Sequence, residues 1–294
     1  MALRIGFRTS PQNVDWPTLE SAWAEAGQHD VFDSGWLNDH FSDPGRERGG
    51  PSFEALTALA GLAHLVPGKH VGHTVLAATF RHPSALAKQA VTLDHLTGGR
   101  FILGLGAGWH VGEHESFGID LPAIGERMGR LEAQVRVLKA LFSDAAREQP
   151  GVTLEAPPYR LDGAVIEPAP VQPGGPPLWL GAQKPRGMRL TARLADGWNY
   201  AANLSGSVDG FRERHDALHR ICDEEGRDIG RITVSVQLIV PDDAGERRRA
   251  RAAAEGYARA GAQVIMLTIP ARGGAGGVRR LASEVALPLR DALG

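Results

Sequence analysis

Short apolar and β-branched runs alternate with amphipathic segments along the chain, and this alternation constrains the fold more than any other feature. Eight runs have the length and composition of strands. Eight strands that alternate with helices predict an α/β protein with a (β/α)8 barrel rather than an open sheet. The eight predicted strands are Leu3–Arg8, Val31–Leu37, His70–Ala77, Phe101–Leu105, Pro177–Gly181, Gly197–Ala201, Thr233–Val240 and Val264–Ile269.

Several segments between these runs have the pattern of helices. Ser84 follows Pro83 and is expected to cap a helix that stops at Gly98-Gly99. An alanine- and arginine-rich segment, GERRRARAAAEGYARAG, suits an exposed helix that ends at Gly261. Another segment has apolar residues at alternating spacings of three and four, which is one helical stripe. That stripe comprises Met128, Leu131, Val135, Leu138 and Phe142.

A chain of 294 residues can bury one large core, and no low-complexity linker divides it. We therefore predict one domain over residues 1–294. The tract Asp144 to Pro176 is rich in proline and glycine and is long for a connection, so we expect an insertion on the barrel before the fifth strand. A second long loop, NDHFSDPGRERGGPS, follows the second strand.

The charges are balanced, with 32 Lys and Arg against 34 Asp and Glu and a formal net charge of −2. This balance argues against nucleic acid as the main partner. Cys222 is the only cysteine, which excludes a disulfide framework. The start, MALRIGFRTS, has no leader pattern, and no apolar run approaches the roughly 20 residues of a membrane span. We expect a cytoplasmic protein without a membrane partner.

The stretch GRFILGLGAGWHVGEHESFG, residues 99–118, contains the fourth strand and the residues after it, and it raises two familiar possibilities. Its G-x-G-x-x-W pattern lacks the third glycine of a dinucleotide fingerprint, and HVGEH makes a poor helix start for a pyrophosphate. HVGEH also fits the zinc pattern H-x-x-E-H. That chemistry needs His110 and His114 on one face of a regular helix, and Gly112 within the motif argues against it. We expect no metal.

The glycines themselves alternate at Gly104, Gly106 and Gly108, which clears one face of the strand. Glycines at the C-terminal end of a barrel strand let a ring or phosphate approach the backbone. Active sites of such barrels lie at this end. The glycines also fit a simpler role, the relief of crowding at a barrel corner, and the pattern alone leaves both interpretations open.

Four motifs in this order resemble the luciferase-like flavin and deazaflavin oxidoreductases: RHP, DHLTGGRF, GLGAGW and ADGWN. The resemblance covers most of the chain to about Asn199 and is closest to the subgroup that uses coenzyme F420. It implies a luciferase-like TIM barrel that binds the cofactor ring at the C-terminal ends of the strands. By this likeness, the glycines of the fourth strand would make room for the ring.

The resemblance also implies which residues hold the cofactor. Relatives have a non-proline cis peptide in the third strand that backs the central ring, and Thr74-Val75 match it. Relatives hold the cofactor phosphate in the loop after the fifth strand, where a helix start and positive side chains favour anions. The family often has Gly-Gly where this chain has Gly181-Ala182. The expected cofactor-binding residues are Thr74, Val75, Gly106, Ala107, Gly108, Trp109, Gly181, Ala182, Gln183, Lys184 and Arg186.

Three residues are expected to take part in catalysis. His40 matches a catalytic histidine of related dehydrogenases, and an imidazole suits proton transfer coupled to hydride transfer. Asp39 is expected to orient or bias that imidazole. Where relatives have a glutamate directly after the glycines, this chain has Trp109, so Glu113 is the substitute acid unless it pairs with an arginine such as Arg127.

Two tryptophans, Trp36 and Trp109, lie at the ends of predicted strands, where they either form walls of the substrate pocket or only pack. After the last strand, Arg272, Arg279 and Arg280 either meet the anionic tail of F420 or belong to a mobile surface loop, and both interpretations stay open.

Three functions remain open from the sequence. The first is an oxidoreductase that uses reduced F420 for hydride transfer to a small organic substrate. The second is a monooxygenase of the alkanesulfonate type that uses reduced FMN and O₂. The third is a non-catalytic flavin-binding protein. The family likeness also allows a homodimer and a flavin or F420 reductase as partner.

Overall fold

The computed structural model describes residues 3–43, 51–202 and 206–293. Within these residues, nine parallel strands form one sheet that closes on itself through pairing of β3 with β5, and a separate antiparallel pair forms a hairpin. The strands are β1 (Arg4–Thr9), β2 (Ser34–Leu37), β3 (His70–His73), β4 (Leu76–Ala77), β5 (Phe101–Gly106), β6 (Val152–Ala156), β7 (Tyr159–Ala164), β8 (Leu178–Leu180), β9 (Gly197–Ala201), β10 (Thr233–Ile239) and β11 (Val264–Ile269).

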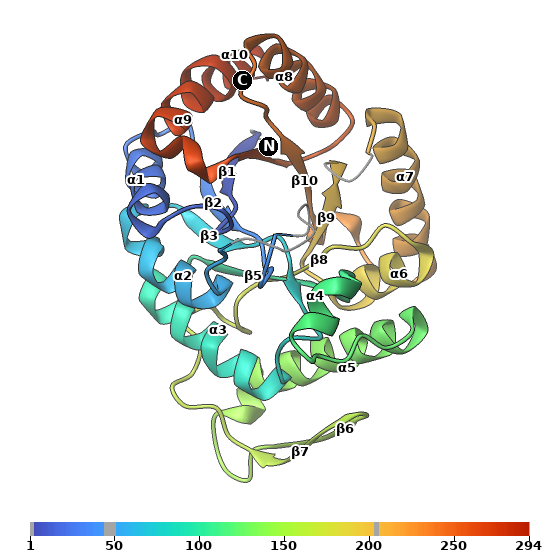
Figure 1. Cartoon of the computed structure of the whole chain (residues 1–294). Coiled ribbons are helices and arrows are strands. Elements are labelled where there is room, and N and C mark those ends of the chain that lie inside the picture. The colour runs from blue at the N-terminus through green and yellow to red at the C-terminus, as the bar shows by residue number, and fades with distance from the viewer. Residues whose placement is uncertain (1–2, 44–50, 203–205, 294) are drawn as a thin grey trace.

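Helices surround the closed sheet (Figure 1). The α-helices are α1 (Trp16–Gly27), α2 (Ala55–Leu62), α3 (Pro83–Thr97), α4 (Val111–Ser116), α5 (Ile124–Phe142), α6 (Pro185–Leu194), α7 (Val208–Glu224), α8 (Ala244–Arg259), α9 (Gly274–Leu281) and α10 (Leu287–Leu293). Short 3-10 turns are η1 (Ala63–Leu65), η2 (Asp144–Ala146), η4 (Ile229–Arg231) and η5 (Ala271–Gly273), and η6 (Ala282–Ala286) is a π-helical turn.

The predicted (β/α)8 barrel is confirmed. The predicted bounds hold for β9 and β11, whereas the second strand begins at Ser34 rather than at Val31. The third predicted strand is divided into β3 and β4 by the pair Thr74-Val75. Both halves pair with β5, so together they occupy one position of the eight-stranded barrel.

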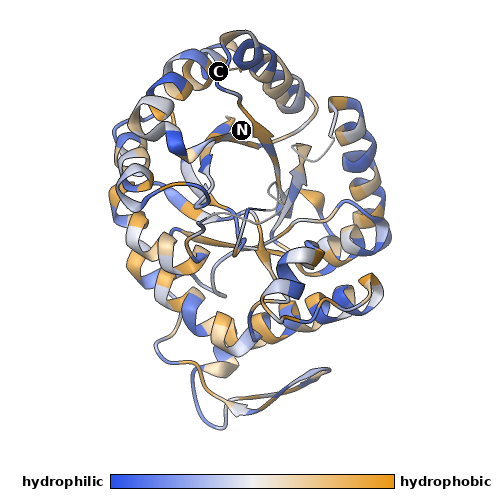
Figure 2. Ribbon diagram, viewed as in Figure 1, coloured by the Kyte–Doolittle hydropathy of each residue, from blue (hydrophilic) through white to orange (hydrophobic). Residues whose placement is uncertain are grey.

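Apolar patterning accounts for the positions of the helices. The predicted stripe on α5 is largely buried, with Leu131, Val135, Leu138 and Phe142 facing the core. Figure 2 shows hydrophobic residues along the barrel strands and hydrophilic ones on the outer faces of helices such as α8. The predicted cap of α3 is wrong by two residues: the helix begins at Pro83, and His82 accepts the N–H of Ser84. No described helix is long and apolar enough to cross a lipid bilayer.

The tract 144–176 is an addition to the barrel, as expected, but it is not irregular throughout. It contains the hairpin of β6 and β7, which projects away from the barrel in Figure 1. The second long loop, at 38–52, is described except for residues 44–50, which lie outside the described part of the chain.

A cluster of side chains fills the interior of the barrel below its mouth. Trp36 is fully buried, and its ring centroid lies 5.3 Å from that of Trp179. Ile102, Val264 and Met266 complete the cluster. The prediction that Trp36 lines the substrate pocket is therefore wrong. Trp36 lies on β2 itself, where alternate side chains point into the barrel.

Candidate active site

A cavity of about 510 Å³ opens at the C-terminal ends of the strands, where active sites of such barrels lie. Its lining comes from loops and strand ends around most of the barrel, which places distant parts of the sequence together. Apart from the three arginines predicted after the last strand, the residues predicted for catalysis or cofactor binding line it. They are Asp39, His40, Thr74, Val75, Gly106, Ala107, Gly108, Trp109, Glu113, Gly181, Ala182, Gln183, Lys184 and Arg186.

The segment between β3 and β4 bulges toward this cavity. The peptide bond between Thr74 and Val75 is cis, as the family likeness implied. Both residues line the cavity, although Thr74 is 4% exposed. The Val75 side chain therefore presents an apolar surface to anything bound against the bulge.

The glycines after the fourth barrel strand accommodate this bulge. A Cβ at Gly104 would lie 2.0 Å from the carbonyl oxygen of His73, and a Cβ at Gly106 would lie 2.7 Å from Cγ2 of Val75. A Cβ at Gly181, after β8, would also contact Val75, at 3.1 Å. The contacts support the relief of crowding, and because Gly106 also lines the cavity, the approach of a ligand stays a prediction. The glycines first make room for the bulge, and the bulge then forms the wall against which a ligand would lie.

A positively charged helix start lies across the cavity from the bulge segment. Helix α6 begins at Pro185, and its N-cap residue, Lys184, provides no side-chain hydrogen bond to the first turn. Uncapped N–H groups with a lysine and an arginine beside them suit a phosphate. Nη1 of Arg186 donates to the carbonyl oxygen of Gly125 at 2.7 Å, which ties α6 to the start of α5.

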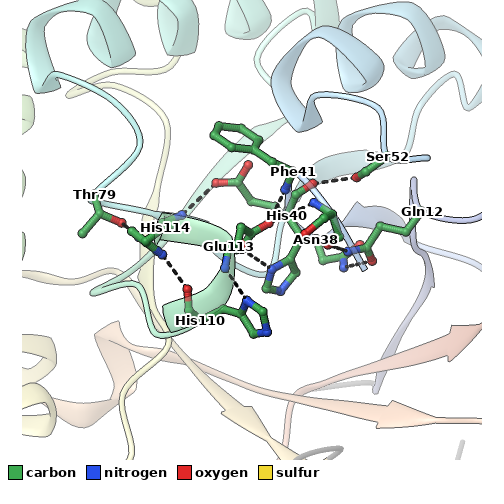
Figure 3. Close-up of polar contacts among 12 residues, drawn as sticks. Gln12, Asn38, His40, Phe41, Ser52, Thr79, His110, Glu113 and His114 are labelled. Carbon is green, nitrogen blue, oxygen red and sulfur yellow. Dashed lines mark hydrogen bonds and ion pairs between the residues drawn. The ribbon is translucent and has the colours of Figure 1, made fainter. Parts of the chain in front are cut away.

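His40 and Glu113 form a pair at the edge of the cavity. Nδ1 of His40 lies 2.9 Å from Oε2 of Glu113, and the other carboxylate oxygen accepts the N–H groups of Phe41 and Ser42 (Figure 3). Burial alone would raise the pKa of Glu113, but the hydrogen bonds and the charge of His40 outweigh it, so the pKa is lowered. Glu113 thus holds the loop after β2, through His40 and not through Arg127.

Asp39 has a different role from the predicted one. Asp39 is 4% exposed. Its carboxylate accepts two hydrogen bonds from Arg81, at 2.7 and 2.9 Å, and one from the N–H of Ala77 at 2.8 Å. These bonds occupy the carboxylate away from the imidazole of His40. Arg81 also pairs with Glu54, the N-cap residue of α2. Asp39 therefore positions the loop, the bulge and α2 relative to one another.

The HVGEH segment does form a regular helix, contrary to the expectation from Gly112. His110 is the N-cap of α4, and its Nδ1 accepts the N–H of Glu113 at 3.0 Å. His114 contacts Oγ1 of Thr79 at 2.7 Å and the carbonyl oxygen of His110 at 2.8 Å through its two ring nitrogens (Figure 3). Both imidazoles are engaged in these local contacts. The described residues contain no group of three or more side chains suited to a metal.

The predicted arginines after β11 do not line the cavity. Arg279 lies on α9 and pairs with Glu25 of α1 at 2.9 Å, outside the barrel. Arg272 faces Asp242 at 3.7 Å and lines a separate hollow with residues such as Gln12. Arg280 lies on the exposed side of α9. The prediction misplaced them because a loop after the last strand became a helix that packs on α1.

Sequence analysis missed four polar residues that line the cavity from inside the barrel. Each lies in or directly after an otherwise apolar strand, which is the signal that the sequence offered. Polar side chains among apolar strand residues point into the barrel and need a partner there. The four are Arg8 on β1, Asn38 after β2, Asn199 on β9 and Gln237 on β10.

Comparison with known proteins agrees with this architecture. The model of the luciferase-like monooxygenase family matches residues 16–285. The chain belongs to this family. It is an oxidoreductase by that membership, and relatives in sequence are named as dehydrogenases.

Two relatives bear the name F420-dependent glucose-6-phosphate dehydrogenase. The one from Kineococcus radiotolerans is 30% identical over 245 residues, which cover 82% of this chain and 69% of the relative. The one from Nakamurella multipartita is 32% identical over 197 residues, which cover 67% of this chain and 55% of the relative. The chain thus spans only about half to two thirds of the length of these proteins.

Solved structures share the fold at low sequence identity. An F420-dependent secondary alcohol dehydrogenase, in complex with an F420–acetone adduct, has a TM-score of 0.80 at 17% identity, with 99% of both chains covered. A long-chain alkane monooxygenase has a TM-score of 0.77 at 13% identity, covering 99% of this chain and 92% of its own.

Replacement of Gly106 by alanine tests whether this glycine makes room for Val75. The added methyl group would overpack the bulge, so we expect a loss of about 1–3 kcal/mol in the free energy of unfolding. In a Val75→Ala background the added methyl group would face Cβ of residue 75 at 3.9 Å instead of Cγ2 at 2.7 Å, and the penalty should shrink. Urea denaturation of the four proteins measures this coupling. An equal penalty in both backgrounds would show that Gly106 does not accommodate Val75.

The decrease in folding stability at low pH tests the ion pairs behind the site. Burial acts to raise the pKa of Glu54, but hydrogen bonds from Thr57 and Arg81 outweigh it and lower the pKa to about 2. A carboxyl group whose pKa is lower in the folded than in the unfolded state stabilises the fold at pH values above its unfolded pKa. This stabilisation is lost as the pH falls through that value toward 2. We expect the stability difference between the natural protein and Glu54→Gln to be smaller at pH 3 than at pH 6. Glu213→Gln, on the exposed face of α7, is the control.

Proposed function

We propose that this protein is an F420-dependent oxidoreductase that transfers hydride between F420 and a small organic substrate in the cavity at the strand ends. The observation that supports it most directly is the similarity to enzymes named as F420-dependent dehydrogenases, over 82% of this chain at 30% identity. Its cavity combines a bulge, an uncapped helix start and a histidine paired with an acid.

The residues present fit a cofactor with a planar ring and a phosphate. Val75 would back the ring, and the cavity wall from Gly106 to Trp109 would flank it. The start of α6 would bind the phosphate through backbone N–H groups, with Lys184 and Arg186 adding positive charge. When bound, F420 supplies the hydride chemistry that no side chain provides.

His40 would move the proton that accompanies hydride transfer. An ionised Glu113 accepts a hydrogen bond, so it favours the tautomer that has its proton on Nδ1 and directs Nε2 away from the pair. Nε2 forms no hydrogen bond with a described residue, and His40 lines the cavity. The ring of Trp109 stands edge-on to the imidazole at 5.8 Å between centroids and limits its rotation.

The substrate is proposed only as a small organic molecule. The match covers only 69% and 55% of two dehydrogenase relatives, and loops set substrate choice in this type of barrel. Trp109 is 55% exposed, and Phe80 lies on the same cavity, so a flat or apolar group would find contacts at the rim.

A second candidate is an FMN-dependent monooxygenase. It is supported by the description of the family and by the fold shared with an alkane monooxygenase. That function would require a reductase partner that supplies reduced flavin. A titration with both cofactors separates the two candidates.

The titration should show that F420 binds at least tenfold more tightly than FMN, a difference of about 1.4 kcal/mol. The reason is the sequence similarity to relatives named as F420-dependent, together with Lys184 and Arg186 at the cavity, which favour an anionic cofactor. Equilibrium fluorescence titration with each oxidised cofactor on the same preparation measures both dissociation constants. Equal affinities, or binding of FMN alone, would make the monooxygenase the better proposal.

Substitution of His40 tests the proton-transfer role. His40→Ala should lower turnover by about 10²- to 10⁴-fold, the usual contribution of a general acid or base, while F420 affinity stays nearly unchanged. Turnover and thermal midpoint are measured on the same preparations, with His219→Ala, exposed on α7, as the control. If His40 only anchored its loop to Glu113, the variant would lose stability and keep its turnover per folded molecule.

A further inference from the structure

Arg8 is a buried arginine at the bottom of the main cavity. It lies on β1, is 7% exposed, and lines the cavity beside the bulge. Its Nε donates to Oγ1 of Thr74 at 2.8 Å, its Nη2 to the carbonyl oxygen of Thr74 at 3.3 Å, and its Nη1 to Oγ1 of Thr268 at 3.3 Å. A guanidinium has about five N–H groups, so these three bonds leave about two for another acceptor.

No carboxylate of the described chain forms an ion pair with Arg8. The two acids that line the same cavity are already engaged, Asp39 by Arg81 and Glu113 by His40. Burial lowers the pKa of Arg8 to about 10, and the side chain is still charged at neutral pH. A buried charge without a counter-ion is costly, and proteins ordinarily pair such groups.

Other buried arginines of this chain follow that ordinary pattern. Arg81 pairs with Asp39 and Glu54, and Arg247 pairs with Glu284 at 2.8 Å between α8 and η6. Arg8 differs from both in facing the cavity with only neutral oxygens as partners. Its counter-ion is therefore best supplied by the molecule that fills the cavity.

The surroundings of Arg8 are polar but carry no negative charge. Gln237 is 7% exposed, and its Oε1 is buried without a hydrogen-bond partner. Asn199 is 2% exposed and holds its amide toward Ser235 and Met266. Both line the same cavity, above the apolar cluster of Trp36 and its neighbours. A ligand oxygen that enters here would meet side-chain N–H donors and one positive charge.

We propose that Arg8 is the centre of an anion-binding subsite at the bottom of the cavity, which takes an anionic oxygen of a planar, carboxylate-like group. A guanidinium suits this group because its N–H donors lie in one plane and match two oxygens. The oxygen comes either from the deazaflavin ring, when it lies against the bulge, or from the substrate. Only the first source rests on the proposed function.

Three variants and two matched probes test the subsite. Arg8→Met removes the charge and keeps an unbranched apolar stem, and Arg8→Lys keeps the charge without the planar donors. Arg247→Met removes a paired buried arginine far from the cavity and serves as the control. Benzoate and benzamide share a shape and differ in charge, so their affinity ratio, measured by calorimetry, reports the subsite even if a variant is less stable. Oxidised F420 is titrated in parallel.

We expect the natural protein to bind benzoate at least tenfold more tightly than benzamide, and Arg247→Met to do the same. Arg8→Met should lose that preference, and Arg8→Lys should keep part of it. If the cofactor supplies the oxygen, Arg8→Met also loses at least tenfold in F420 affinity, and bound F420 removes the preference for benzoate. If the substrate supplies it, F420 affinity is unchanged and the preference persists in the F420-loaded protein.

The proposal is overturned if Arg8→Met keeps both its F420 affinity and the benzoate-to-benzamide ratio of the natural protein. It is also overturned if the natural protein shows no preference for benzoate and Arg8→Met binds F420 normally. Failure of the natural protein to bind F420 would refute the proposed function alone. The benzoate and benzamide arm on the cofactor-free protein would then still decide the role of Arg8.

Discussion

The carboxylate of Asp39 holds together the parts of the barrel on which the candidate site depends. It pairs with Arg81 and accepts the N–H of Ala77, so the loop after β2 is fixed to the strand that follows the bulge. Arg81 extends this link to Glu54 at the start of α2. Removal of one partner of such a buried ion pair destabilises the folded protein by about 3–5 kcal/mol. His40 is the next residue along the chain, so its position depends on the contacts of Asp39 with Arg81 and Ala77.

The fold could be predicted from the sequence because it rests on local patterns. Eight apolar runs and the stripe on α5 are set by periodicity, which a single sequence displays directly. The helix of HVGEH could not be predicted in this way, because His110 caps it from outside and Glu113 is fixed by His40, 73 residues away. The break between β3 and β4 also escaped periodicity, and only the family likeness indicated Thr74-Val75.

The sequence predicted which residues belong to the site, but not which contacts these residues make with one another. The predicted catalytic residues and the predicted ring- and phosphate-binding residues line one cavity, whereas the arginines after β11 do not. Asp39 pairs with Arg81 rather than His40, and the glycines make room for Val75. Motifs identify which residues gather at strand ends. They do not identify partners that lie far apart in sequence, because those depend on how the closed barrel brings the ends of β2, β3, β4 and β5 together.

Buried polar atoms without partners in the fold distinguish residues that serve function from residues that stabilise the structure. Arg81 and Arg247 have carboxylates and act as links between elements. Arg8 and Gln237 lie inside the barrel among apolar strands, and the fold supplies neither an acid for the one nor a donor to Oε1 of the other. A chain selected for stability alone would place apolar side chains at these two positions, as it does one layer below at Trp36 and Met266. Polar groups retained at such a cost are best explained by a ligand that completes them.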